Sequence, residues 1–466
     1  RQRSWGIPLP VFYDESGDPF LDADYINFLA AKVEKQGTSV WFEEPEHRLL
    51  KGFPLPSRWR PETLRKGSDT LDVWMDSGCS HWAILKPKEE WPADLYLEGS
   101  DQHRGWCQSS LWTSVLMTGG RAPYRTVLTH GFFIDEENRQ KISKSEGPPQ
   151  TSEHYVERFG ADVLRLWVAS ENYRDDIPVS QAILDHVVNT YRTLRNTLRF
   201  QLGNLFDFRY DLHALPLDQL MSLDQWALHE TTQLIQKVET AYEAYEFHKV
   251  YQEVGRFCTI VLSARYHDIL KDRLYTLAPS SPERRSAQTA IFLIFNTLVR
   301  LLAPILVFTT DEAYAYLKSD GDFVDDSIHL GDFPVVPKSW NFEKIHADIH
   351  ALFHIREDVQ EALEGARREG IIGQSLDAQV ELTISEGTEK ALLLKKFEPH
   401  LPEYFIVSQV HLTPESNPSK SLIVRVRHAD GVRCPRTWRW VDELVEVKGI
   451  GPVSKRCAQF LTHTFP

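Results

Sequence analysis

The hydrophobic and polar positions between residues 93 and 147 alternate in a way that predicts a βαβ unit. Leu95–Leu97 is a short apolar run that ends at Glu98-Gly99, and a second apolar run ends at His130-Gly131. Between the two runs, residues 108–117 carry helical periodicity. Polar residues therefore gather at the carboxyl ends of both predicted strands. In an open parallel sheet, ligands bind at this edge.

The residues before this unit also read as short strands and a helix. Alternating apolar residues over 7–11 predict a strand, and residues 24–36 predict an amphipathic helix. Residues 69–78 read as a further strand that ends in a polar turn. We therefore expect a parallel α/β sheet in residues 1–165.

From residue 153 the apolar period becomes helical. Residues 185–317 show almost no strand pattern, and a capping box is predicted at Ser222–Gln225. The predicted helices cover residues 155–167, 181–205, 222–245, 247–262 and 282–317. Further along, a helix over 348–368 and strands over 378–384 and 422–426 predict a small α/β module. The expected domains are 1–165 (sheet), 166–345 (helix bundle), 346–428 (α/β module) and 429–466 (tail).

Composition narrows the class of protein. With 466 residues, 42% of them apolar and 25% charged, the chain is globular and has more than one domain. A net charge of −14 means that any polyanion must be bound by local basic patches. The five scattered cysteines suggest no disulfide framework, and no apolar run is long enough for a membrane span. These features predict a cytoplasmic protein.

The loop Lys141-Ile-Ser-Lys-Ser145 is the strongest local signal. Its hydroxyls and backbone N–H groups can hydrogen-bond phosphate oxygens, and its lysines can neutralise charge on a leaving pyrophosphate. Taken alone, however, the five residues would be interpreted as a solvated basic turn.

Together with other motifs, this loop resembles the signature of the class I aminoacyl-tRNA synthetases, Lys-Met-Ser-Lys-Ser. Within that class the chain resembles the bacterial isoleucyl enzymes over nearly its whole length. The matching stretches lie at residues 1–6, 72–78, 98–106, 160–167, 191–200, 271–275 and 372–376. Pro148 and Ile371 depart from the residues usual in the family, Asn and Lys.

The resemblance implies roles for individual residues. Trp74 and Trp106 would wall the pocket for the isoleucine side chain, and Gln102 would bind near its ammonium. The aminoacyl-adenylate would be contacted by Glu98, Gly99 and Asp101, and its adenine side by His130 and Gly131. For both tryptophans the alternative is core packing, and for His130 it is a structural histidine at a strand end. ATP and Mg²⁺ are the implied cofactors, and no side chain acts as a nucleophile.

Two basic regions are candidates for tRNA binding. Arg192, Arg195 and Arg199 share one face of a predicted helix, although for any one of them a salt-bridged surface helix is the preferred interpretation. The tail is locally basic and offers Arg436 and Trp438. In the family this region resembles a zinc knuckle with two Cys-x-x-Cys pairs. Here Cys434 and Cys457 are remnants of such a site, and two thiolates cannot close a tetrahedral one, so no tight zinc is expected.

The family's other ATP motif, His-x-x-His, and its editing insertion do not occur in these residues. The resemblance therefore implies the carboxy-terminal half of an isoleucine–tRNA ligase, in which residues 1–165 are the second half of a Rossmann-type parallel sheet and residues 166–345 an anticodon-binding helix bundle. It also implies that Lys141, Ser143 and Lys144 are catalytic residues that hold the ATP phosphates, with Lys144 the foremost. The partners of the ligase would be isoleucine, ATP and tRNA-Ile, and it would be a monomer that is inactive in this form. The alternative is a non-catalytic tRNA-binding protein derived from a synthetase.

Overall fold

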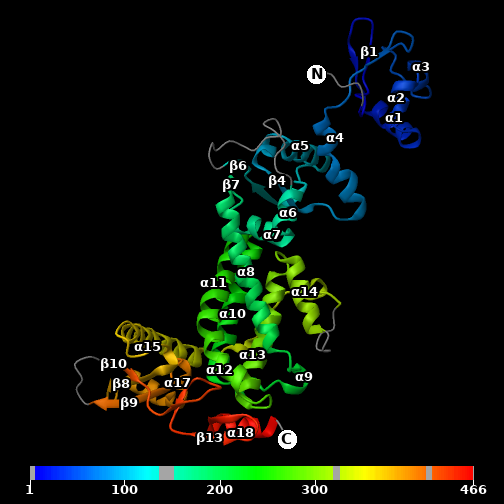
Figure 1. Cartoon of the computed structure of the whole chain (residues 1–466). Coiled ribbons are helices and arrows are strands. Elements are labelled where there is room, and N and C mark those ends of the chain that lie inside the picture. The colour runs from blue at the N-terminus through cyan, green and yellow to red at the C-terminus, as the bar shows by residue number, and fades with distance from the viewer. Residues whose placement is uncertain (1–5, 136–151, 319–325, 416–421, 465–466) are drawn as a thin grey trace. The chain divides into compact units, whose positions relative to one another are not determined.

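The computed structural model in Figure 1 describes residues 6–135, 152–318, 326–415 and 422–464. They form two compact units. The first comprises residues 1–134 with 173–177, and the second comprises 135–172 with 178–466. The Lys141–Ser145 loop, and with it all three predicted catalytic residues, lies outside the described residues.

The first unit begins with a small aromatic core. Strands β1 (Phe12–Tyr13), β2 (Pro19–Phe20) and β3 (Arg65–Lys66) form an antiparallel sheet in the order β2-β1-β3. Helices α1 (Ala23–Gln36), α2 (Ser39–Glu43) and α3 (Glu46–Leu49) follow in sequence. Phe12, Tyr25 and Trp41 are fully buried there, with ring centroids 5.3 to 5.6 Å apart around Phe12. The helix predicted over 24–36 is confirmed.

The predicted βαβ unit is also confirmed. Strand β4 (Ala93–Gly99) is followed by helix α5 (Trp106–Thr118) and strand β5 (Tyr124–His130), and the two strands pair in parallel. A short 3₁₀ turn, η3 (Ser100–Arg104), connects β4 to α5. Strands β6 (Phe133–Asp135) and β7 (Ile177–Val179) pair with each other farther on.

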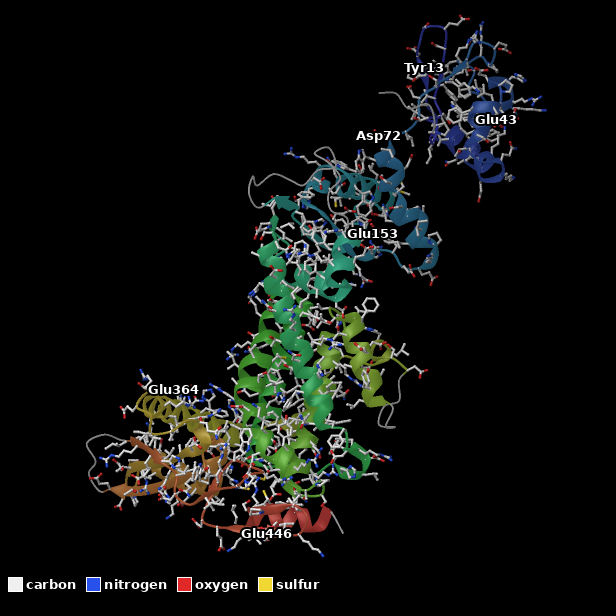
Figure 2. All side chains as sticks on the ribbon, in the orientation of Figure 1. Tyr13, Glu43, Asp72, Glu153, Glu364 and Glu446 are labelled. Atoms are coloured by element: carbon white, nitrogen blue, oxygen red, sulfur yellow. The ribbon has the colours of Figure 1, made fainter. Side chains whose placement is uncertain are left out.

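The strand predicted over 69–78 is wrong. Residues Val73–Gly78 form helix α4, because the carboxylate of Asp72 (labelled in Figure 2) caps it by accepting a hydrogen bond from the Trp74 N–H at 2.8 Å. Gly78 then allows α4 to pack tightly on α5, since a Cβ there would lie 3.0 Å from the carbonyl carbon of Ser109. A π-helical turn, η1 (His81–Leu85), and a 3₁₀ turn, η2 (Lys86–Lys88), follow.

The second unit opens with the predicted helix bundle. Its core is apolar, with Trp226, Leu228, Ile291 and Phe295 fully buried. The helices are α6 (Ser152–Phe159), α7 (Ala161–Ser170), α8 (Gln181–Asn204), α9 (Tyr210–His213), α10 (Ser222–Glu243), α11 (Phe247–Arg256), the π-helical η6 (Phe257–His267), α12 (Asp268–Thr276), α13 (Pro282–Leu302) and α14 (Val307–Lys318). Short 3₁₀ turns lie at Leu217–Gln219, Ile328–Leu330, Lys338–Trp340, Ser375–Asp377 and Glu398–His400.

Three details of the predicted helices are wrong. The helix over 155–167 is broken at Gly160, whose φ of 86° is favourable only for glycine. The helix over 282–317 is broken around Pro304, and the Asp162 carboxylate accepts hydrogen bonds from the N–H groups that start α14, at 2.7 Å for Thr309. Ser222 is the first helical residue of α10 and makes no capping hydrogen bond.

The predicted α/β module follows the bundle. Helix α15 (Glu343–Arg368) leads to a sheet of order β10-β8-β9, in which β8 (Ala378–Ser385) is parallel to β9 (Gln409–Glu415) and antiparallel to β10 (Leu422–His428). Helices α16 (Glu389–Lys396) and α17 (Leu401–Tyr404) lie between β8 and β9 in sequence. The tail consists of two hairpins and a helix: β11 (Val432–Arg433) with β12 (Trp440–Val441), β13 (Leu444–Val447) with β14 (Gly451–Ser454), and α18 (Lys455–Thr464).

A buried charge network joins bundle and module inside the second unit. Arg273 on α12 forms ion pairs with Asp224 on α10 and with Glu403 on α17. The Asp224 carboxylate also accepts hydrogen bonds from Tyr266 and Ser286. One guanidinium is therefore shared by two carboxylates, and the two hydroxyls add hydrogen bonds to Asp224.

Candidate functional site

The carboxyl ends of β4 and β5 lie side by side, as the sequence predicts. In the parallel register Glu98 is opposite Thr129, and Gly99 is opposite His130. Residues that are 31 positions apart in the chain are thus neighbours at one sheet edge. This edge brings Glu98, Gly99, His130 and Gly131 together.

Crowding at this edge accounts for the glycines. A Cβ on Gly131 would lie 2.3 Å from the Asp175 carbonyl oxygen, which no other residue can tolerate. The Gly131 N–H donates to the Tyr173 carbonyl at 2.8 Å. At Gly99 a Cβ would lie 2.8 Å from the Asp101 carboxylate and 3.2 Å from the Phe132 ring. The absence of a side chain at both glycines therefore allows neighbouring segments to lie close to the backbone.

Gln102 and Trp74 converge on the start of α5. The Gln102 side-chain oxygen accepts a hydrogen bond from the Trp106 N–H at 3.1 Å. A Cβ on Gly105 would lie 2.8 Å from that oxygen and 3.5 Å from the Trp74 ring. Trp74 itself is 43% exposed, so its indole is not a core side chain. Asp101, in the same turn, is exposed.

Trp106 is fixed by two contacts. Its ring stacks on Tyr96, with centroids 4.5 Å apart and an interplanar angle of 23°, and its indole N–H donates to the Ser77 carbonyl at 2.9 Å. The Tyr96 hydroxyl is in turn hydrogen-bonded to Ser110 at 2.9 Å. Trp106 thus has the packing contacts of a core residue while it remains half-buried beside Gln102.

His130 is held in one orientation. Its Nδ1 lies 2.7 Å from the Gly131 carbonyl oxygen, so Nδ1 carries the proton and donates, and Nε2 is an acceptor. The ring meets Phe132 edge-on, with centroids 6.2 Å apart. This hydrogen bond is of the kind that a structural histidine at a strand end makes, and Nε2 takes no part in it.

Sequence reasoning missed the segment around Asp176. The Asp176 carboxylate accepts a hydrogen bond from the Phe132 N–H at 2.8 Å, across 44 residues of sequence. No local pattern marks this segment, because only the tertiary fold brings residues 173–177 to the end of β5.

The three predicted tRNA-binding arginines of α8 are all exposed. Arg195 and Arg199 line a cavity of about 580 Å³ between α8, α13 and α14, with Arg195 3.8 Å from Glu312. Arg192 donates to the Asn189 side chain at 3.4 Å. The three arginines therefore lie exposed along α8. The ion pair between Arg195 and Glu312 is weak because both side chains are solvated.

The tail residues Arg436 and Trp438 differ in their surroundings. The Arg436 guanidinium donates to the Thr276 carbonyl at 2.5 Å, which ties the tail to α12. Trp438 is 55% exposed and has a φ of 60°, with the Arg433 guanidinium 5.5 Å from its ring. Trp438 is thus the more accessible of the two.

The two cysteines of the tail are buried in one apolar cluster with Val447 and Val453. Burial alone would raise the pKa of the Cys434 thiol. Hydrogen bonds from the Thr437 side chain and from backbone N–H groups, including that of Ser454 at 3.3 Å, outweigh burial and lower this pKa to about 6. Within the part of the chain that the structure describes, no three His, Cys, Asp or Glu side chains form a metal-binding group.

The comparison with known proteins agrees with this arrangement. Residues 1–180 match the tRNA synthetases of class I for isoleucine, leucine, methionine and valine, and residues 224–382 match the anticodon-binding domain of tRNA ligases. The chain contains a class I tRNA synthetase domain and an anticodon-binding domain. The expectation from its motifs is confirmed, as is the fold class of parallel sheet, helix bundle and small C-terminal sheets.

Curated relatives of this synthetase chain include isoleucine–tRNA ligases from several bacteria. Those of Thermoanaerobacter sp. (strain X514) and Persephonella marina are each 42% identical to it, over 474 and 477 residues, which is 99% of this chain and 50% of each relative. That of Symbiobacterium thermophilum is 43% identical over 94% of this chain and 48% of its own length. The chain thus spans about half the length of the curated relatives it matches.

A solved structure shows the same fold. The leucyl-tRNA synthetase of Agrobacterium radiobacter K84, in a ternary complex with tRNA and LeuAMS, has a TM-score of 0.51 at 15% identity. The match covers 92% of this chain and 51% of that one. Among the described residues, no helix is long and apolar enough to cross a membrane.

Proposed function

We propose that this chain forms part of an isoleucine–tRNA ligase, which joins isoleucine to tRNA-Ile with ATP. The observation that carries the proposal is 42% identity to such ligases over 99% of this chain. The register of β4 and β5 supports it, because it gathers Glu98, Gly99, His130 and Gly131 at one sheet edge. The protein would act in the cytoplasm as a monomer.

The proposed chemistry needs no protein nucleophile. The isoleucine carboxylate attacks the α-phosphorus of ATP, a P–O bond to pyrophosphate breaks, and isoleucyl-adenylate forms. A ribose hydroxyl of the tRNA then attacks the acyl carbon and releases AMP. Lys141, Ser143 and Lys144 would bind the phosphates and neutralise the charge that develops on pyrophosphate, while Mg²⁺ would accompany ATP.

The described residues would bind the rest of the adenylate. Trp106 is a rigid wall, because stacking and a hydrogen bond fix its ring, and Trp74 offers a partly exposed ring beside Gln102. Glu98 and Asp101 would contact the adenylate and Gln102 the ammonium of isoleucine. An apolar pocket of this kind distinguishes amino acids that differ by one methylene by about 1–3 kcal/mol, and this enzyme class is the standard example of that limit.

Amino-acid-dependent exchange of pyrophosphate into ATP tests the proposal in the complete ligase that contains these residues. Isoleucine should support faster exchange than valine, leucine or methionine, and equal or slower exchange would refute the assignment. Gln102→Leu should lower kcat/KM for isoleucine at least about tenfold. Gln252→Leu, at an exposed position of α11, is the matched control. The 466 residues alone should catalyse no exchange, since they span half of their relatives.

A second candidate is RNA binding without catalysis. The exposed arginines and aromatic rings of the second unit favour it, since they require nothing from the β4–β5 edge. Absence of exchange in the complete protein, together with retained tRNA binding, would select this candidate.

A further inference from the structure

Tyr96 on β4 contacts two successive turns of helix α5. Its ring stacks on Trp106, the first residue of α5, with centroids 4.5 Å apart and an interplanar angle of 23°. Its hydroxyl is hydrogen-bonded at 2.9 Å to Ser110, about one helical turn after Trp106. Tyr96 is 5% exposed and Ser110 is fully buried. A single side chain of the sheet therefore fixes the start of α5 at two points.

The start of α5 carries both kinds of contact that isoleucine needs in the proposed ligase. The Trp106 ring would face the apolar side chain of isoleucine. The Trp106 backbone N–H donates to the Gln102 side chain at 3.1 Å, and Gln102 would bind near the ammonium. One residue therefore connects the apolar and the polar part of the pocket. Any movement of Trp106 relative to β4 changes the distance between these two parts.

The remaining contact of the Trp106 ring does not replace the support from Tyr96. The indole N–H donates to the Ser77 carbonyl of α4 at 2.9 Å. This hydrogen bond holds one edge of the indole and allows the ring to tilt about that point, whereas stacking on Tyr96 fixes its plane. Tyr96 is held in turn, because its ring lies 4.9 Å from that of Tyr124 on β5 and its hydroxyl is bound by Ser110.

We propose that Tyr96 is a positioning residue that determines specificity for isoleucine over valine, because it holds Trp106 in place as a wall of the pocket. This proposal rests on the ligase function proposed above. Isoleucine and valine present the same ammonium to Gln102 and differ by one methylene. Dispersion falls steeply with distance, so a gap of about 0.5–1 Å already forfeits roughly a quarter to a half of the attraction between two atoms. A wall that moves away therefore weakens the binding of isoleucine more than that of valine.

Pyrophosphate exchange by the complete ligase tests the role of Tyr96. The quantity measured is kcat/KM for isoleucine divided by kcat/KM for valine. Tyr96→Leu removes both contacts with α5 and should lower this ratio at least about fivefold, within the about 10–200-fold that one methylene is worth. Tyr96→Phe keeps the stacking and should lower the ratio only about two- to threefold. A residue that merely supports the fold would lower both kcat/KM values together and leave their ratio unchanged.

Two further variants control for effects on folding. Ser110→Ala removes the partner of the Tyr96 hydroxyl and leaves every ring in place, so it should reproduce the effect of Tyr96→Phe. The double variant should be no worse than either single one, because both remove the same hydrogen bond. Tyr25→Leu is the matched control, since Tyr25 is a fully buried tyrosine in the small aromatic core of the first unit. It should leave the ratio unchanged even where it lowers stability.

The outcomes separate this proposal from the ligase assignment. An unchanged ratio in Tyr96→Leu would overturn the role of Tyr96 and leave the ligase standing. Should that variant not fold, unchanged ratios in both Tyr96→Phe and Ser110→Ala would have the same meaning. An unmodified enzyme that exchanges pyrophosphate no faster with isoleucine than with valine would refute the ligase assignment and this proposal together.

Discussion

Helices α5 and α13 both contain many apolar residues, but they bury different kinds of side chain. On α13, the large residues Ile291, Phe295 and Leu298 are fully buried. On α5 the small polar residues Ser110, Thr113 and Ser114 are buried, while Trp112 and Leu116 are 61% and 76% exposed. The bundle closes its core with its own side chains, whereas the apolar side of α5 is not covered among the described residues. Exposed apolar surface of this kind marks a face that packs against other protein.

Hydrogen bonds explain why α5 presents its polar side to the sheet. The Thr113 hydroxyl donates to the Gly78 carbonyl at 2.9 Å, and the Ser114 hydroxyl to the Arg121 carbonyl at 2.8 Å. Ser110 is hydrogen-bonded to Tyr96. Small side chains let α4 and β4 approach the helix closely, and their hydroxyls remain satisfied when buried. The number of apolar residues in a helix therefore does not predict which of its faces is buried.

The largest effect is expected where the bundle buries charge. Arg273→Met should lower the free energy of unfolding of the second unit by about 3–5 kcal/mol, since it leaves the buried Asp224 and Glu403 without their partner. Urea unfolding followed by circular dichroism measures the change. Arg195→Met, at an exposed ion pair, should change it by less than about 1 kcal/mol. Equal effects of the two variants would show that the network adds nothing to the core.

The comparison is tested by a leucine-to-alanine substitution in each of the two helices. Leu298→Ala on α13 should cost about 2–5 kcal/mol, because it leaves a cavity in a closed core. Leu116→Ala on α5 should cost less than about 0.5 kcal/mol in the same chain, because this side chain is 76% exposed. Thermal unfolding measured for both variants checks the pair. A large loss for Leu116→Ala would mean that α5 is covered within this chain.

A smaller effect should depend on pH. Burial lowers the pKa of His267 in the bundle to about 3. The native state then binds fewer protons than the unfolded state, whose histidines titrate near about 6.5, so stability falls as the pH drops below that value. Between about pH 6.5 and pH 5 the loss should be roughly 1–2 kcal/mol.

His267→Phe keeps the stacking on Phe200, whose ring centroid is 4.4 Å away, and should remove this part of the pH dependence. His354→Phe, at an exposed position of α15, should retain it. Urea midpoints measured at several pH values decide between these outcomes. An unchanged pH dependence in His267→Phe would contradict the assignment.

The smallest effect is expected in the tail, where the Cys434 sulfur lies in an apolar cluster and accepts a hydrogen bond from the Ser454 N–H. Dialysis against a chelator should leave its unfolding unchanged, and metal analysis should find far less than one zinc per chain. Thr437→Cys combined with Ser454→Cys should bind one zinc, since both positions are hydrogen-bonded to Cys434. Stoichiometric zinc in the unmodified chain, resistant to dialysis, would refute the expectation.

Much of the fold could be predicted because its signals are local. The βαβ unit, the bundle and the small C-terminal sheet follow from periodicity in the sequence, and the order of motifs led to the correct family. The errors lie where a single residue overrides the pattern. Asp72 caps a helix where a strand was expected, and Gly160 breaks a helix whose apolar spacing is continuous.

The candidate site, too, could be predicted from the sequence only in part. Glu98-Gly99 and His130-Gly131 could be placed at one edge from the sequence, because parallel strands end together. The contact of Asp176 with Phe132 could not be predicted. It joins residues that are far apart in sequence and carry no periodic signal.

The sequence by itself determined the elements, their order and the family, because helical and strand periods and short motifs are properties of neighbouring residues. Only the tertiary structure decided which side of α5 is buried and which arginines stand beside exposed rings. It also showed that the buried Cys434 sulfur accepts a hydrogen bond from the Ser454 N–H, 20 residues farther along the chain. Burial and hydrogen bonding depend on what the rest of the chain brings to a residue, and this is fixed only when the chain folds.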